Sequence, residues 1–81
     1  MENVKGKILD TIEGIIEEIV YTNEINGYTV CDIVCGKDII TAVGYLPFVS
    51  VGETIKVTGK WVIHPDYGRQ LKVEYFEKIY P

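Results

Sequence analysis

The residues best suited to binding a ligand gather in the second half of the chain, around the segment His64-Pro65-Asp66-Tyr67-Gly68. The ring of Tyr67 can stack on an unpaired nucleic-acid base, and the guanidinium of Arg69 can contact a phosphate. Lysines before and after this segment add positive charge. The pattern indicates a surface for single-stranded nucleic acid, with Tyr28, Lys56, Lys60, Tyr67, Arg69 and Lys72 as the candidate binding residues.

The same residues also allow interpretations without nucleic acid. His64, Asp66 and Tyr67 can serve only to hydrogen-bond their own loop into shape. Tyr28 falls in the solvent-facing phase of a predicted strand, where it can stack on a base or pack against a neighbouring domain or partner. The chain's aromatic residues, 11% of the sequence, exceed what a core this small can hide. Some of them must therefore lie on the surface.

Residues with catalytic spacing are absent from the sequence. No GxxxxGK[ST] loop is present to cradle a nucleoside triphosphate, and the single histidine, His64, has no nucleophile at a recognisable spacing. Glu17 and Glu18 are adjacent, so in a strand they point to opposite faces. We therefore expect no catalytic residue, no cofactor and no enzymatic activity in this chain.

The two cysteines, Cys31 and Cys35, fall within one predicted strand. Four residues of strand span about 13 Å, beyond the roughly 7 Å that separates Cα atoms joined by a disulfide. The same separation, with only one histidine in the chain, argues against a shared metal ion. We expect two small buried apolar side chains and no metal site.

The charge is unevenly distributed along the chain. The net charge is −4, with −5 in residues 1–40 and +1 in residues 41–81. A domain that binds nucleic acid through phosphates is usually basic, so contact with DNA is expected from the C-terminal half and is expected to be weak. The polar N-terminus resembles no secretory signal, and no apolar run is long enough for a membrane helix. The expected location is the cytoplasm, without membrane attachment.

Alternating apolar and polar residues predict five strands, over residues 12–21, 28–35, 39–45, 54–63 and 69–78. Asn26-Gly27 is a strong hairpin-turn signal between the first two strands. Short connections and little helix predict an all-β fold, a small five-stranded barrel of the OB type, because closure removes exposed strand edges. Residues 11–81 form this barrel, and residues 1–10 are expected to be a loosely ordered extension.

The first strand also fits a helical stripe, since isoleucines recur there at helical spacing. The β-branched residues, Gly14 and the following hairpin turn favour a strand, in which Gly14 marks a bend or bulge. The alternation places Phe76 toward solvent and Tyr75 in the core phase. The predicted interior consists of Ile16, Cys31, Ile33, Ile55, Val57, Trp61, Leu71 and Val73.

Three sequence elements resemble the N-terminal OB domain of the RecD/TraA-like ATP-dependent DNA helicases, the stand-alone bacterial relatives of RecD. They are Asn23-Glu24-Ile25-Asn26-Gly27-Tyr28-Thr29-Val30, Val43-Gly44-Tyr45-Leu46-Pro47, and Gly59-Lys60-Trp61 followed by His64-Pro65-Asp66-Tyr67-Gly68-Arg69-Gln70. The resemblance covers about residues 11–80, and Leu71 departs from it where the family usually has phenylalanine.

The resemblance implies an accessory domain of a larger helicase that unwinds DNA 5′ to 3′. The ATP and Mg²⁺ sites would belong to motor domains outside this chain. The leading hypothesis is a module that guides or holds single-stranded DNA for the motor. The alternative is a non-catalytic docking module that contacts other domains of the same helicase, or a protein partner, without touching DNA.

Overall fold

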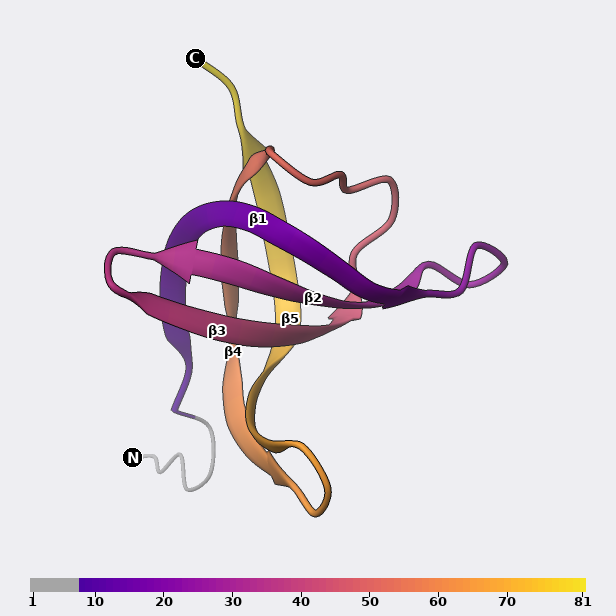
Figure 1. The fold of residues 1–81 in the computed structure, drawn as a ribbon, viewed down its shortest axis with the longest axis vertical. Coiled ribbons are helices and arrows are strands. Elements are labelled where there is room, and N and C mark those ends of the chain that lie inside the picture. The colour runs from indigo at the N-terminus through magenta and orange to yellow at the C-terminus, as the bar shows by residue number, and fades with distance from the viewer. Residues whose placement is uncertain (1–7) are drawn as a thin grey trace, which may run out of the picture.

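The structure is a computed structural model that describes residues 8–81. Its strands are β1 (Asp10–Thr22), β2 (Tyr28–Cys35), β3 (Asp38–Tyr45), β4 (Thr54–His64) and β5 (Gly68–Ile79). They close into a barrel in the order β1-β2-β3-β5-β4, in which only β3 and β5 pair in parallel. In Figure 1, β1, β2 and β3 cross in front of β4 and β5. The expected all-β class and five-stranded barrel are confirmed.

The N-terminal extension expected over residues 1–10 lies mostly outside the described residues, and β1 already begins at Asp10. The segment that also fitted a helix is a strand throughout. Nowhere in residues 8–81 is there a helix of the length and apolar character needed to cross a membrane.

β1 pairs with two different strands along its length. Its first half pairs with β4 and its second half with β2, and Ile15 is the residue at which the partner changes. β1 therefore bends near Gly14, as expected. Its bulges lie farther along the strand, at two register shifts that leave Glu17 and Val20 without a partner on β2. The first bulge separates the inward-facing Ile16 and Ile19 by three positions instead of two, which explains the helix-like spacing of the isoleucines.

Gly14 is required for a different reason. A Cβ at Gly14 would lie 2.2 Å from the carbonyl oxygen of Val34. Gly59 on β4 is constrained in the same way, since a Cβ there would lie 2.1 Å from the carbonyl oxygen of Lys72. Side chains at these positions would push apart strands that must stay in contact for the barrel to close.

The first hairpin has its turn at Asn26-Gly27, where the sequence predicts it. Asn23 closes the turn, because its backbone N–H donates to the carbonyl of Tyr28 at 2.8 Å and its carbonyl accepts from the N–H of Gly27 at 2.8 Å. Gly27 has a φ of 78°, a conformation that glycine adopts without steric cost. The expected hairpin is confirmed.

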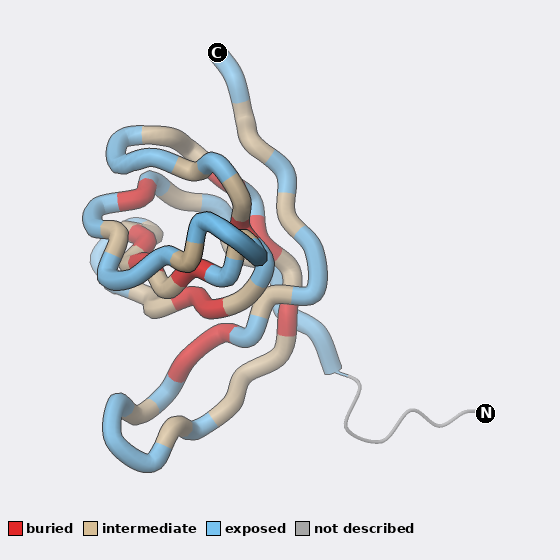
Figure 2. The backbone as a smooth tube through the Cα atoms, turned by 90° about the vertical axis from the view of Figure 1, so that its right-hand side faces the viewer, coloured by how far each residue is buried: buried red, intermediate tan, exposed pale blue. Residues whose placement is uncertain are grey.

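The core lies inside the barrel, where Figure 2 shows the buried segments of the backbone. Trp61 and Val73, which were expected inside, are half-buried and pack against this core. The expected residues that are fully buried are Ile16, Cys31, Ile33, Ile55, Val57 and Leu71. Most of the predicted interior is confirmed.

The prediction for the end of β5 was wrong. A register shift between Thr58 and Gly59 leaves Glu74 of β5 without a partner on β4. The extra residue reverses the alternation, so Phe76 packs against the core and Tyr75 is exposed. Simple alternation through the sequence assigned these two rings to the opposite faces.

Candidate nucleic-acid interface

The outer face of β2 and β3 carries the candidate interface. Thr29, Cys31 and Ile33 of β2 are buried, so the residues between them face outward. Residues paired across neighbouring strands share a face, so Val30 and Asp32 extend this outer surface to Val43 and Thr41 of β3. In OB folds, this face and its flanking loops commonly bind oligonucleotides and oligosaccharides.

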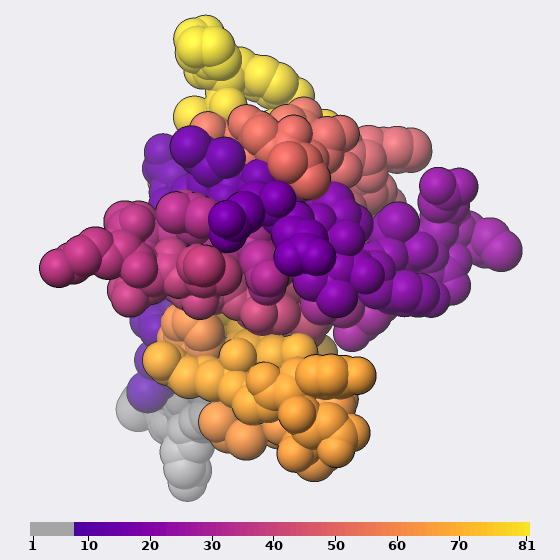
Figure 3. Space-filling view, in the orientation of Figure 1, coloured from indigo at the N-terminus to yellow at the C-terminus, as the bar shows by residue number. Residues whose placement is uncertain are grey.

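A groove of about 590 Å³ runs over this face, and we call it the outer groove. Strands β1 to β3 form its floor and one end, and the hairpin between β4 and β5 forms the other end. Figure 3 shows this side of the molecule, with the orange hairpin beneath the purple and magenta strands. The lining residues are Val20, Tyr21, Tyr28, Val30, Asp32, Thr41, Val43, His64, Tyr67 and Gln70.

Aromatic rings stand at both ends of the outer groove. Tyr21 and Tyr28 lie at the end formed by β1 and β2, with ring centroids 6.4 Å apart and planes tilted by 56°. Tyr67 lies at the hairpin end and is 77% exposed. The expected exposure of Tyr28 and Tyr67 is confirmed, and both rings have area free for stacking on a flat ligand.

His64 shapes the hairpin turn. Its Nδ1 accepts the backbone N–H groups of Asp66 at 3.0 Å and of Tyr67 at 3.2 Å. Its ring also packs against that of Tyr67, with centroids 4.7 Å apart. His64 therefore has the structural role considered above, while Tyr67 stays exposed at the tip.

Two lysines meet on the outer face beside the outer groove. Lys60 of β4 is directly opposite Lys72 of β5, and Lys72 is level with Val43 of β3. Like charges placed opposite each other across strands are destabilising, and neither lysine has an ion-pair partner among residues 8–81. A bound anion such as phosphate would relieve this repulsion.

Arg69 lies on the other face of the hairpin. Its register partner is Ile63, one residue out of phase with Lys60 and Lys72, and its Cζ lies 4.0 Å from the centroid of the Trp61 ring. The indole Nε1 of Trp61 in turn donates to the carboxylate of Asp10. The structure thus divides the expected basic patch: Tyr67, Lys60 and Lys72 share one side, and Arg69 is exposed on the other.

Lys56 is also separated from the outer groove. On the outer face of β4 it lies opposite Glu13 of β1 and Glu77 of β5, so its charge has acidic neighbours on both sides. It does not line the outer groove.

Comparison with known proteins places this chain in a family. Residues 9–81 match the family model of the OB-fold domain of the ATP-dependent DNA helicase YrrC. The chain belongs to this family. The resemblance to a helicase OB domain, expected from the sequence motifs, is confirmed at this level.

A solved structure supports the fold of this OB-fold domain. A chain of the S. pombe Stn1–Ten1 complex matches it with a TM-score of 0.69 and 21% sequence identity. The match covers 88% of the OB-fold domain and 57% of that chain, so the domain spans little more than half of the matched chain's length. At this identity the likeness shows the fold alone.

Sequence reasoning missed part of the OB-fold domain's outer groove. Tyr21 was overlooked because the β1 bulges hide which residues face outward. Gln70 stood in the quoted motif without a role, and Asp32 looked like ordinary strand polarity. Asp32 and Gln70 become candidate binding residues only when strand pairing brings β2, β3 and β5 side by side.

Beneath the outer groove, Cys31 is buried in the core. Burial, with a smaller contribution from the neighbouring Asp32 carboxylate, raises the pKa of the Cys31 thiol to about 11. The thiol therefore stays protonated and is a poor nucleophile at neutral pH. Within residues 8–81, no three His, Cys, Asp or Glu side chains come together as metal ligands would.

Proposed function

We propose that this OB-fold domain holds single-stranded DNA in the outer groove for the motor of a 5′ to 3′ DNA helicase of the RecD/TraA-like type. The observation that carries the proposal is the pairing of exposed tyrosine rings at both ends of one groove with two adjacent lysines at its edge. Bases would stack on Tyr28 and Tyr67, and phosphates would approach Lys60 and Lys72.

The surrounding protein is part of this proposal. The motor domains, with their ATP and Mg²⁺, would lie elsewhere in a cytoplasmic bacterial helicase, and this domain would contribute no catalytic residue. The net charge of −4 fits a domain that holds a strand weakly, in support of a motor that holds it more strongly.

The experiment is fluorescence anisotropy of a labelled single-stranded oligonucleotide at low salt. Tyr28→Ala and Tyr67→Ala should each weaken binding by about 5- to 150-fold, since a base–aromatic stack contributes about 1–3 kcal/mol. Tyr75→Ala is the matched control, because Tyr75 is 63% exposed but lies outside the outer groove. Equal losses in all three variants, or no binding by the parent protein, would refute the proposal.

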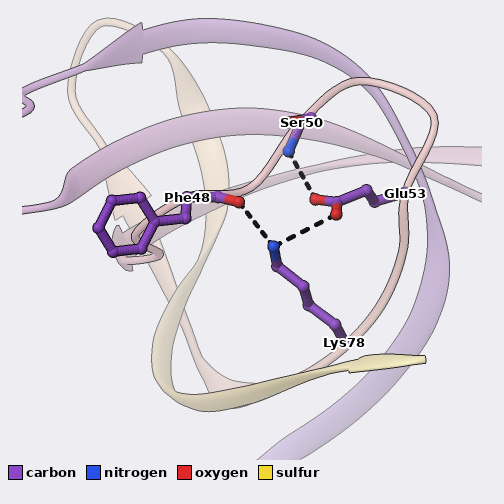
Figure 4. A network of polar contacts seen from close by, with 4 residues as sticks. All are labelled: Phe48, Ser50, Glu53 and Lys78. Carbon is purple, nitrogen blue, oxygen red and sulfur yellow. Dashed lines mark hydrogen bonds and ion pairs between the residues drawn. The ribbon is translucent and has the colours of Figure 1, made fainter. Parts of the chain in front are cut away.

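A second candidate function is docking to another domain of the same helicase, and one residue favours it. Phe48, in the connection between β3 and β4, is 91% exposed and has a φ of 62°, a strained conformation for a bulky residue. Figure 4 shows what holds it there. Lys78 Nζ donates to the Phe48 carbonyl at 2.6 Å and pairs with Glu53 at 3.2 Å, while Glu53 accepts the N–H of Ser50 at 2.7 Å.

Strain of this kind is typical of functional positions and costs about 1–3 kcal/mol. Replacing Phe48 by glycine would remove both the strain and the exposed ring. If Phe48 anchors a neighbouring domain, Phe48→Gly should make the isolated domain more stable to heat and weaken its binding to the rest of the helicase supplied in trans. Ile63→Ala, another exposed apolar residue, is the control for non-specific loss. Undiminished binding by Phe48→Gly would remove the docking candidate.

A further inference from the structure

A row of polar side chains crosses the floor of the outer groove. Asp32 of β2 pairs with Thr41 of β3, and the parallel register of Ala42 with Leu71 places Thr41 level with Gln70 of β5. All three line the outer groove. We call Asp32, Thr41 and Gln70 the polar row.

Gln70 is unusual within this row because it is only 7% exposed. Among residues 8–81 its side-chain amide has no hydrogen-bond partner. Buried polar groups are nearly always hydrogen-bonded, to protein or to water. Because Gln70 lines the outer groove, a ligand there that offers a donor and an acceptor can pair with this amide in place of water.

Asp32 is held in place at the other end of the row. The hydroxyl of Thr41 donates to Oδ1 of Asp32 at 2.8 Å, which fixes the carboxylate. Its other oxygen, Oδ2, has no hydrogen-bond donor among residues 8–81. A carboxylate only accepts hydrogen bonds, and its negative charge repels both phosphates and carbonyl oxygens. It therefore favours ligand groups that present N–H donors.

The spacing suits the edge of one base. Neighbouring strands lie about 4.8 Å apart, so Asp32 and Gln70, with β3 between them, have Cα atoms separated by about 10 Å. Both side chains line the outer groove, so a base edge placed over Thr41 would meet Asp32 on one side and Gln70 on the other. The tyrosines at the two ends of the outer groove are placed for the flanking bases.

We propose that the polar row reads the Watson–Crick edge of one base and selects guanine. Guanine presents the N1–H and N2–H donors side by side, which a carboxylate accepts as a pair, next to the O6 acceptor, to which the Gln70 amide can donate. On the same edge, cytosine and adenine present only one donor group, the exocyclic amine. Thymine flanks its one N–H with two carbonyl oxygens, so it is the base most strongly disfavoured by Asp32.

This inference rests on the proposed function, because it requires single-stranded DNA in the outer groove. The test is anisotropy with labelled oligothymidine that carries thymine, hypoxanthine or guanine at one central position. A bidentate base contact is worth about 1–3 kcal/mol of discrimination, so the guanine strand should bind about tenfold more tightly than the thymine strand. Hypoxanthine, which lacks the N2 amine, should fall between the two.

Two variants identify the residues that discriminate. Asp32→Asn should abolish the guanine preference while raising affinity for the thymine strand, because it removes a negative charge and introduces a donor. Its amide oxygen can still accept from Thr41, so folding should be retained. Gln70→Met should reduce the guanine preference without strengthening binding to the thymine strand, because a buried thioether cannot donate to O6.

Glu18→Gln is the matched control for charge. Glu18 is the register neighbour of Asp32 on β1 and does not line the outer groove. Its neutralisation should raise affinity for all strands alike and leave the guanine preference intact. Equal affinity of the parent protein for guanine and thymine strands would overturn base selection and leave strand binding standing. Failure to bind any strand would overturn the proposed function and base selection together.

Discussion

The guanidinium of Arg69 packs on the indole of Trp61, with Cζ 4.0 Å from the ring centroid. This contact changes the role that the sequence suggested for Arg69. Instead of reaching for a phosphate beside Tyr67, Arg69 covers a half-buried tryptophan on the opposite face of the hairpin. The two residues stabilise each other and the end of the barrel.

Arg69→Ala should therefore lower the free energy of unfolding by about 1 kcal/mol, through the lost cation–π contact and the exposure of Trp61. Trp61→Ala should cost more, about 3 kcal/mol, because the ring packs on the core. Urea denaturation of both single variants and the double variant gives the coupling energy, with Tyr67→Ala as an exposed control. Strictly additive losses would show that the observed contact contributes nothing.

The facing lysines predict opposite effects on stability and binding. Lys60→Ala and Lys72→Ala should each leave the domain as stable as before or more stable by up to about 1 kcal/mol, because like-charge repulsion is removed. Together they should flatten the slope of log K against log salt for single-stranded DNA by about 1.4, or about 0.7 for each phosphate contact. The comparison variant is Lys56→Ala, whose lysine lies between Glu13 and Glu77 and should leave the slope unchanged.

Gly14 and Gly59 lie where neighbouring strands approach each other closely, so substitutions at these positions should strongly destabilise the domain. Gly14→Ala and Gly59→Ala should each cost about 3 kcal/mol or more, because the added methyl group would meet a backbone carbonyl that cannot move without opening the barrel. Gly36→Ala is the comparison. Its added Cβ would meet nothing within 4 Å, and its φ of 64° should cost only about 1 kcal/mol. The denaturation midpoints of the three variants rank their stabilities. Equal losses of stability in the Gly36 and Gly59 variants would contradict this account.

The buried thiol predicts a loss of stability at alkaline pH. Its pKa is raised from 9.0 to about 11, so the unfolded chain releases the proton before the folded domain does. The contribution is fully present below about pH 9, and about 3 kcal/mol is lost as pH rises through 11. Tyrosines and lysines titrate in the same range, so the quantity to measure is the difference between the parent and Cys31→Ala. A difference that does not change with pH would mean that the thiol ionises equally well in the folded state.

The sequence predicts strands well here because the apolar residues alternate and the turns carry glycine or proline. It fails where a single residue interrupts the alternation. Nothing in the composition of β5 indicates that Glu74 bulges, and so the faces of Tyr75 and Phe76 were exchanged. The bulge at Glu17 in β1 gave isoleucines the spacing of a helix. Bulges depend on which strand lies alongside, and that is a property of the closed barrel.

Likewise, only some residues of the candidate site could be predicted from the sequence. Tyr28 could be proposed from the sequence because it falls in the solvent-facing phase of a strand, and Tyr67 because it stands in a turn, where exposure is expected. Asp32 and Gln70 could not be associated, because β3 lies between them and the parallel pairing of β3 with β5 joins segments far apart in the chain. Arg69 has the phase of Leu71 in the predicted strand, but the sequence interpretation grouped it with the turn residue Tyr67; its pairing with Ile63 shows that the strand phase decides its face.

That parallel pairing also determines where the barrel opens most easily. β3 and β5 meet over only two register pairs, Ala42 with Leu71 and Val43 with Lys72, whereas β4 and β5 pair along almost their whole length. Transient opening, seen as amide hydrogen exchange, should begin at this narrow seam. The outer groove crosses the same seam, with Thr41 and Val43 on one side and Gln70 on the other. A strand bound there would bridge the seam and slow its opening, so occupancy of the groove would be detectable as protection of backbone amides beneath the ligand.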